Sequence, residues 1–199
     1  MILSNLKVGL SMMEIEELIK LDKEIYDRAK KSIAEVKPCQ QCGWCCNNKR
    51  ILVTIPEMIR ILKHTGKTFF KVFKIESNRL SVSIKTKKVN GKPYCIFYEN
   101  GKCSIHQIKP FQCFTYPVIF HPLIFRINPP FCIDNNIYVF KCQSPNDNKA
   151  ISSIYVKDFK EITSIRIDFL NKNYEIQRKL IAKRKLRKVL KEMISNERA

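Results

Sequence analysis

Cysteines are the residues of this chain whose types and spacing predict chemistry. Nine are present, and four of them lie in one short stretch that reads Cys39-Gln-Gln-Cys42-Gly-Trp-Cys45-Cys46. Thiolates two residues apart can bind a soft metal together, because the backbone between them reverses direction and directs successive sulfurs to one point. The stretch therefore predicts a metal centre, but it does not identify a reaction.

The remaining cysteines follow later in the chain. They are Cys95, Cys103, Cys113, Cys132 and Cys142. Asn100-Gly101 lies between the first two, and glycine adopts the positive φ that a tight hairpin turn requires. We therefore expect Cys95 and Cys103 to face each other across a short hairpin or knuckle, and a short helix after Pro110 to carry Cys113 inward.

The number of thiols bears on the kind of metal. A structural zinc ion takes four ligands, and an iron–sulfur cluster also takes four thiolates. One tetrahedral set available here consists of Cys39, Cys42, Cys103 and Cys113. That set leaves other cysteines over, and the adjacent Cys45 and Cys46 point in different directions, so they are not expected to bind one mononuclear ion together. The excess favours an iron–sulfur cluster, and one or two zinc ions remain the alternative.

Other catalytic patterns are weaker or absent in the sequence. His106 and His121 could complete a mixed metal site, although such histidines more often lie on the surface or in the core with their hydrogen bonds made by other groups. The sequence contains no Gly-rich phosphate loop, no His-Glu-x-x-His and no Cys-x3-Cys-x2-Cys. A Cys–His nucleophile pair is disfavoured because so many cysteines compete for metal.

Composition indicates a globular protein and a reducing compartment. No apolar run approaches the roughly 20 residues needed to cross a bilayer, and the first residues are too polar for a secretory signal. We therefore expect a cytoplasmic protein without a transmembrane segment, in which clustered thiols are metal ligands more often than disulfides.

The formal net charge of +19 is large for 199 residues. It is compatible with a protein or nucleic-acid partner at a basic surface, and hence with a zinc-stabilised nucleic-acid-binding protein. The alternative is a solvated, lysine-rich surface. In the basic tail, apolar residues recur on one face, which favours docking of this helix on the domain: Ala182, Leu186, Val189, Leu190 and Met193.

Several elements that must position the cysteines can be predicted from local patterns. Ser11 and Glu14 form a capping-box pattern before an amphipathic helix over about residues 12–35, which Pro38 should end. A second capping box, Thr54-Ile-Pro-Glu57, predicts a helix over about residues 55–64 that Gly66 stops.

Shorter elements follow that second helix. We expect another short helix from Thr68 through Phe73 and a half-buried strand over residues 80–84. Prolines between residues 118 and 140 indicate extended, edge-like segments.

The predicted fold class is α+β and mostly helical, with a small irregular cysteine-rich metal core and short hairpins. Amphipathic N- and C-terminal helices flank this core. We expect a single cysteine-cluster domain over residues 1–199, with its core at 38–145 and a basic helical tail at about 156–195.

The two cysteine groups together resemble the CxxCxxCC family, which is described as a zinc- or iron-chelating domain. The resemblance covers about residues 38–117, with a weaker correspondence at Cys142. The family's opening motif matches Cys39-x-x-Cys42-x-x-Cys45-Cys46, and its capped helix matches Thr54-Ile-Pro-Glu57. Its second motif matches Cys95-Ile-Phe-Tyr-Glu-Asn-Gly-Lys-Cys103-Ser-Ile105, followed by Lys109-Pro110, Cys113 and Tyr116-Pro117.

The resemblance implies a bound metal and a set of ligands. The implied ligands are Cys39, Cys42, Cys45, Cys46, Cys95, Cys103 and Cys113, with Cys142 as a further candidate. Flagellin lysine methylases look related through the same motif, which implies an alternative function as an iron–sulfur-dependent protein methyltransferase. The chain departs from the family pattern at His106, where a Tyr is frequent, at Lys109, where an Arg is usual, and after Cys142, where glycines are absent.

Overall fold

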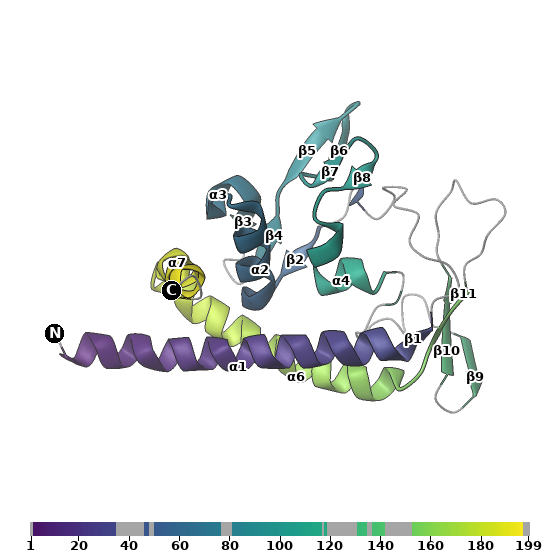
Figure 1. The fold of residues 1–199 in the computed structure, drawn as a ribbon, viewed down its shortest axis with the longest axis horizontal. Helices are drawn as coiled ribbons and strands as arrows, with labels where there is room; N and C mark the ends of the chain where they lie inside the picture. Colours follow the sequence, from purple (N-terminus) through teal and green to yellow (C-terminus); the bar gives the residue numbers. More distant parts are fainter. Residues whose placement is uncertain are drawn as a thin grey trace.

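The computed structural model describes the backbone of residues 2–34, 46–47, 50–76, 81–116, 118, 131–134, 137–141 and 153–196. The long N-terminal helix α1 (Ile2–Ser32) packs against α6 (Phe159–Ala182). Figure 1 shows α2 (Ile55–Thr65) and the short hairpins on one side of this pair. The predicted class, α+β and mostly helical, is confirmed.

Helix α1 is longer at its start and shorter at its end than the sequence predicts. It begins at Ile2 instead of near residue 12, and it ends at Ser32, well before Pro38. The end is set by strand pairing, because β1 (Ile33–Ala34) pairs antiparallel with β11 (Ser153–Val156). The Ser32 hydroxyl also donates a hydrogen bond to the carbonyl of Lys157.

Helix α2 has the predicted start and stop. The Glu57 amide donates to Thr54 Oγ1 at 3.4 Å, and the Thr54 amide donates to Glu57 Oε2 at 2.8 Å, which completes the capping box. Gly66 ends the helix with φ of 62°, a left-handed conformation that costs glycine little. The following helix α3 (Phe69–Val72), with Thr68 as its N-cap, ends one residue earlier than expected, because Phe73 begins a strand.

A three-stranded antiparallel sheet follows, in the order β2 (Leu52–Val53), β4 (Val82–Ile84), β3 (Phe73–Ile75). The strand predicted near residues 80–84 is therefore present. Its burial differs from the prediction, because Val82, Ser83 and Ile84 are all buried instead of alternating. Since β4 is the central strand, both of its faces are covered, and the buried Ser83 hydroxyl donates a hydrogen bond to Glu76.

Two hairpins lead from this sheet to the second cysteine group. Strands β5 (Thr86–Val89) and β6 (Lys92–Cys95) form the first, and β7 (Tyr98–Glu99) and β8 (Lys102–Cys103) form the second. Both have the predicted Asn-Gly turns, in which asparagine and glycine all adopt positive φ.

Two short helical turns come next. The 3-10 turn η2 spans His106–Ile108, and α4 spans Phe111–Phe114 directly after Pro110, as predicted. A four-stranded antiparallel sheet at the far end of α1 has the order β1-β11-β10-β9, where β10 is Ile137–Lys141 and β9 is Phe131–Asp134. The predicted edge-like character therefore holds for β9, whereas β10 is internal.

The basic tail consists of two helices instead of one. Val156 is still in β11, and α6 ends at Ala182, where Arg184 with φ of 53° turns the chain before α7 (Leu186–Asn196). The apolar face that was predicted to dock on the domain is buried at four of its five positions: Leu186, Val189, Leu190 and Met193. Ala182 is exposed because α6 ends there. Helix α7 packs on α2.

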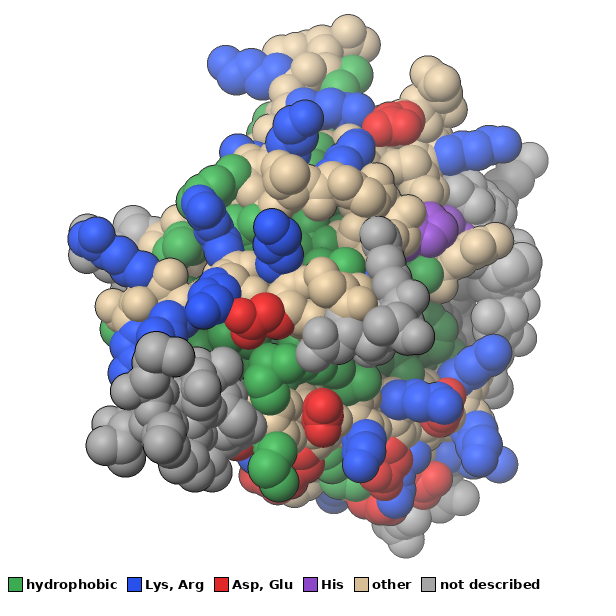
Figure 2. Space-filling model, turned by 60° about the vertical axis from the view of Figure 1, so that its left-hand side comes forward, with side chains coloured by type: hydrophobic (Ala, Val, Ile, Leu, Met, Phe, Trp, Pro, Cys, Tyr) green, Lys and Arg blue, Asp and Glu red, His purple; other side chains and the backbone are tan. Residues whose placement is uncertain are grey.

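Within the described ranges, no helix has the length and apolar character needed to cross a bilayer. Figure 2 shows lysine and arginine side chains spread over one face of the molecule, with hydrophobic and uncharged surface between them. Arg187 of the basic tail lies over the exposed ring of Phe70, 4.7 Å from its centroid. Binding of a nucleic acid or protein at the basic surface stays a prediction.

Candidate metal centre

The structure describes part of the predicted ligand set. Cys46, Cys95, Cys103 and Cys113 are described with their side chains. Other candidates lie outside the described residues: Cys39, Cys42, Cys45, His121 and Cys142. Cys132 lies in β9, where only the backbone is described.

A backbone contact joins the end of the first cysteine motif to the start of the second. Asn47 and Tyr94 form an isolated antiparallel bridge. Their neighbours Cys46 and Cys95 therefore lie on adjoining segments, and both are buried, with 9% and 4% of their surface exposed. The two motifs meet here although the sequence between them forms α2, α3 and a three-stranded sheet.

The second cysteine group differs in register from the prediction. Cys103 is paired with Tyr98 across its hairpin, and Cys95 is paired with Thr86 in the preceding hairpin, so these two cysteines are not partners across one hairpin. The hairpins are held together by the stacked rings of Tyr94 and Tyr98, whose centroids are 4.8 Å apart. Pairing of β7 and β8 uses a two-residue loop, which fixes Cys103 opposite Tyr98.

Cys113 lies in α4 and is half-buried. Phe111 is the fully buried residue of this turn, with 3% of its surface exposed, and Cys113 is partly buried against the same core. The Phe111 amide donates a hydrogen bond of 2.8 Å to Glu57 Oε1, so the same carboxylate that caps α2 also holds the start of α4. The position of Cys113 thus depends on α2.

The chemistry of the donors fits a soft metal, because the four implied cysteine ligands with described side chains are all thiols and two of them are shielded from water. In the part of the chain that the structure describes, no three His, Cys, Asp or Glu side chains gather as a metal site. The complete ligand set therefore stays a prediction that involves cysteines outside the described residues.

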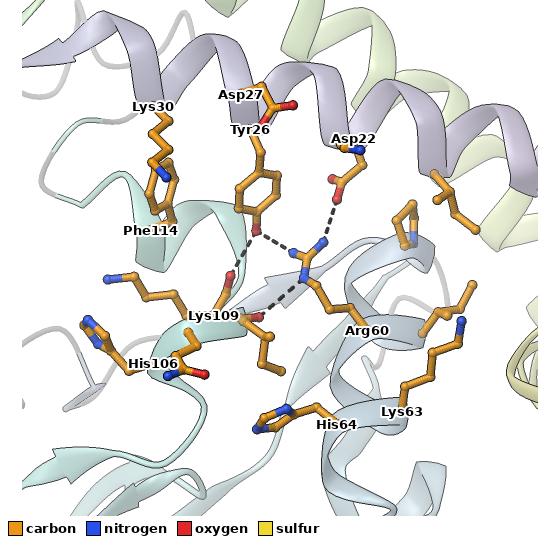
Figure 3. Close-up of a pocket in the computed structure, with 16 residues that line it drawn as sticks. Asp22, Tyr26, Asp27, Lys30, Arg60, Lys63, His64, His106, Lys109 and Phe114 are labelled. Carbon is orange, nitrogen blue, oxygen red and sulfur yellow. Dashed lines mark hydrogen bonds and ion pairs between the residues drawn. The ribbon is translucent and has the colours of Figure 1, made fainter. Parts of the chain in front are cut away.

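Sequence patterns did not predict the buried network of charged residues that joins α1, α2 and α6. Arg60 on α2 donates to Asp22 on α1 at 2.9 Å and to the Tyr26 hydroxyl at 2.6 Å (Figure 3). Arg166 on α6 lies 3.6 Å from Asp22 and 3.7 Å from Glu57. The one available signal was Asp22, an acid one turn from Leu18 and Ile25 on the apolar face of α1.

Charges in this network are set by burial. Burial raises the pKa of Asp22 to about 6, with Glu57 adding to the rise and Arg60 and Arg166 opposing it. Burial also raises the pKa of Tyr26, so the phenol stays protonated and donates to the Lys109 carbonyl at 3.0 Å. Lys109 lies between Cys103 and Cys113, so the network connects α1 to the second cysteine motif.

The family pattern of CxxCxxCC, described as a putative zinc- or iron-chelating domain, matches residues 38–133. Over these residues the chain is similar to a CxxCxxCC domain. This domain contains both cysteine motifs and the Asn47–Tyr94 bridge, whereas α1, α6 and α7 lie outside the match. No similar curated protein and no similar solved structure was found. The resemblance to flagellin lysine methylases stays a prediction.

Proposed function

We propose that the CxxCxxCC domain holds an iron–sulfur cluster. The proposed ligands are drawn from Cys39, Cys42, Cys45, Cys46, Cys95, Cys103 and Cys113. The observation that carries the proposal is the Asn47–Tyr94 bridge, which joins the segment of the first motif to that of the second. Since the family is described as zinc- or iron-chelating, thiols on segments joined in this way are suited to a shared inorganic centre.

The choice of a cluster over zinc rests on the number of thiols. Seven cysteines match the two motifs, and one tetrahedral zinc uses four ligands. An iron–sulfur cluster supplies redox-active iron and sulfide, and its potential depends on solvent exposure and on hydrogen bonds to sulfur. The protein contributes burial of Cys46 and Cys95 and the hairpins that carry Cys95 and Cys103.

Metal analysis of the full chain tests the proposal directly. Protein purified without oxygen is expected to be brown and to contain iron and acid-labile sulfide in similar amounts. A colourless protein that contains stoichiometric zinc and no sulfide would overturn the iron–sulfur proposal and leave the coarser assignment, a zinc- or iron-chelating domain, in place.

A further inference from the structure

A cavity of about 790 Å³ lies between α1, α2 and the segment from η2 to Phe114 (Figure 3). Its volume is within the range of about 300–1,000 Å³ typical of small-molecule sites. The η2 side of its wall is built from residues between Cys103 and Cys113, so the cavity borders the second cysteine motif, and the lining residues that the structure describes include no cysteine.

One end of the cavity is fixed by hydrogen bonds. All three guanidinium nitrogens of Arg60 are in use, on Asp22, on the Tyr26 hydroxyl, and on the Ile108 carbonyl at 3.5 Å. The guanidinium also lies over the Tyr26 ring, 4.6 Å from its centroid. Arg60 therefore balances Asp22 and holds the wall in place, instead of serving as the main anchor for a ligand.

The remaining charges of the lining are mostly positive. The lysines of the lining are Lys23, Lys30, Lys63 and Lys109. Among the described lining residues, one further carboxylate, Asp27, stands against them. Figure 3 shows these charged groups coming from different elements, with Lys30 on α1, Lys63 on α2 and Lys109 beside η2. Such an excess in a concave site attracts anions, because low-dielectric walls concentrate the field.

The cavity also has apolar walls. Ile19 on α1, Ile59 on α2 and Phe114 on α4 contribute to the lining. Phe114 packs against the Tyr26 ring, 5.5 Å between centroids, so this wall is held in place. Apolar walls combined with a few charged groups are typical of sites that bind an organic molecule, whereas a simple inorganic ion would leave these walls unused.

We propose that this cavity binds a small organic anion that has an apolar or planar body and carries phosphate or carboxylate groups. The lysines act as point charges for the anionic groups, and Ile19, Ile59 and Phe114 contact the body. This binding site is separate from the proposed cluster, and it does not depend on which metal the cysteines hold. A cationic methyl donor such as S-adenosylmethionine is disfavoured by the same lysines.

Calorimetric titration of the full chain at low salt tests the proposal with four probes. Adenosine 5′-monophosphate and adenosine differ in the phosphate alone, phthalate presents carboxylates on a ring, and S-adenosylmethionine carries a sulfonium. We expect one or both anions to bind, and whichever binds more tightly identifies the anionic group. The proposal is overturned if neither anion binds more tightly than adenosine, or if S-adenosylmethionine binds best.

A matched pair of double variants locates the binding. Lys30→Gln with Lys109→Gln removes two charges from the cavity, and Lys88→Gln with Lys92→Gln removes two from the exposed β5–β6 hairpin. We expect the cavity variant to bind the anion about tenfold more weakly and the hairpin variant to bind nearly as well as wild type. Equal losses in both variants would indicate general attraction to a basic protein and would overturn the proposed site. Unchanged thermal unfolding of both variants serves as the folding control.

Discussion

Asn47 and Tyr94 are joined by an antiparallel backbone bridge that places the buried Cys46 and Cys95 on adjoining segments. Each of the two cysteine motifs is local in sequence, but a bridge between them is a tertiary contact that neither motif specifies. A metal centre shared by both motifs requires such a contact. The bridge is therefore the structural basis for treating the cysteines as one set.

Cys46→Ser and Cys95→Ser test whether these two thiols are ligands. We expect each variant to lose most of its iron or zinc, because a serine hydroxyl is a hard and weakly acidic donor that replaces a thiolate poorly. Metal per chain is measured after purification without oxygen. Cys132→Ser is the control, since Cys132 in β9 is outside the proposed set and should leave the metal content unchanged. Full metal content in both Cys46→Ser and Cys95→Ser would exclude both residues as required ligands.

Glu57→Gln tests the carboxylate that serves two elements. Glu57 is buried and accepts from the amides of Thr54 and Phe111, each at 2.8 Å. We expect the free energy of unfolding to fall by about 1.5–3 kcal/mol, because hydrogen bonds to a charged group are strong and the nearby Arg166 loses a countercharge. Urea unfolding measures the change.

The matched control is Glu161→Gln. Glu161 pairs with Arg28 at 2.7 Å on the surface, where 60% of its side chain is exposed. Its loss should cost about 0–1 kcal/mol, as is usual for exposed ion pairs. If Glu57→Gln and Glu161→Gln lost the same unfolding free energy, the two hydrogen bonds of Glu57 would not stabilise the fold as their geometry indicates.

Asn173→Ala tests the contact between α6 and the first turn of α2. The Asn173 side-chain oxygen accepts the Ile55 amide at 2.8 Å, and the residue is fully buried. Alanine would leave that amide without its acceptor, so we expect a loss of about 1–3 kcal/mol in urea unfolding. Asn171→Ala, at an exposed position of the same helix, should change stability by less than about 0.5 kcal/mol. A similar small effect at residue 173 would contradict the inferred role of Asn173 in holding α2.

Asp22 predicts a pH dependence of a definite sign. Its pKa is about 6 in the folded protein, against 3.8 for an ordinary aspartate, so the folded state holds the Asp22 proton more tightly than the unfolded chain. The contribution of Asp22 to stability is therefore largest below about pH 4 and declines as the pH rises to about 6. Wild type should thus lose stability relative to Asp22→Asn across this interval, as measured by urea unfolding at several pH values. An increase relative to Asp22→Asn would mean that Arg60 and Arg166 outweigh burial.

Local signals predicted several elements because their causes are local. Thr54 and Glu57 cap α2 by contacts within one turn, and Asn100-Gly101 turns a hairpin through the φ values that these two residues tolerate. Ser11 and Glu14 form a similar capping pattern, yet α1 runs through both. A capping box favours a helix start but does not prevent residues before it from continuing the helix.

Long-range contacts set what the sequence did not predict. Ile33 leaves α1 because β11, more than a hundred residues later, provides a strand partner. Cys95 is the strand partner of Thr86 instead of Cys103 because the chain forms two successive hairpins, and register depends on where the first one closes. Asp22 finds Arg60 and Arg166 only when α1, α2 and α6 pack, so an isolated acid on α1 carried little information.

Glu57 and Ile55 lie within the family match, but Arg166 and Asn173, which contact them, lie on α6 outside it, and Asp22, the partner of Arg60, lies on α1. The CxxCxxCC segment of this protein is thus not a portable module. Transplanted alone into another polypeptide, it would expose one unpaired arginine and one unpaired carboxylate to whatever neighbours it met. A successful graft would therefore also have to include helices α1 and α6.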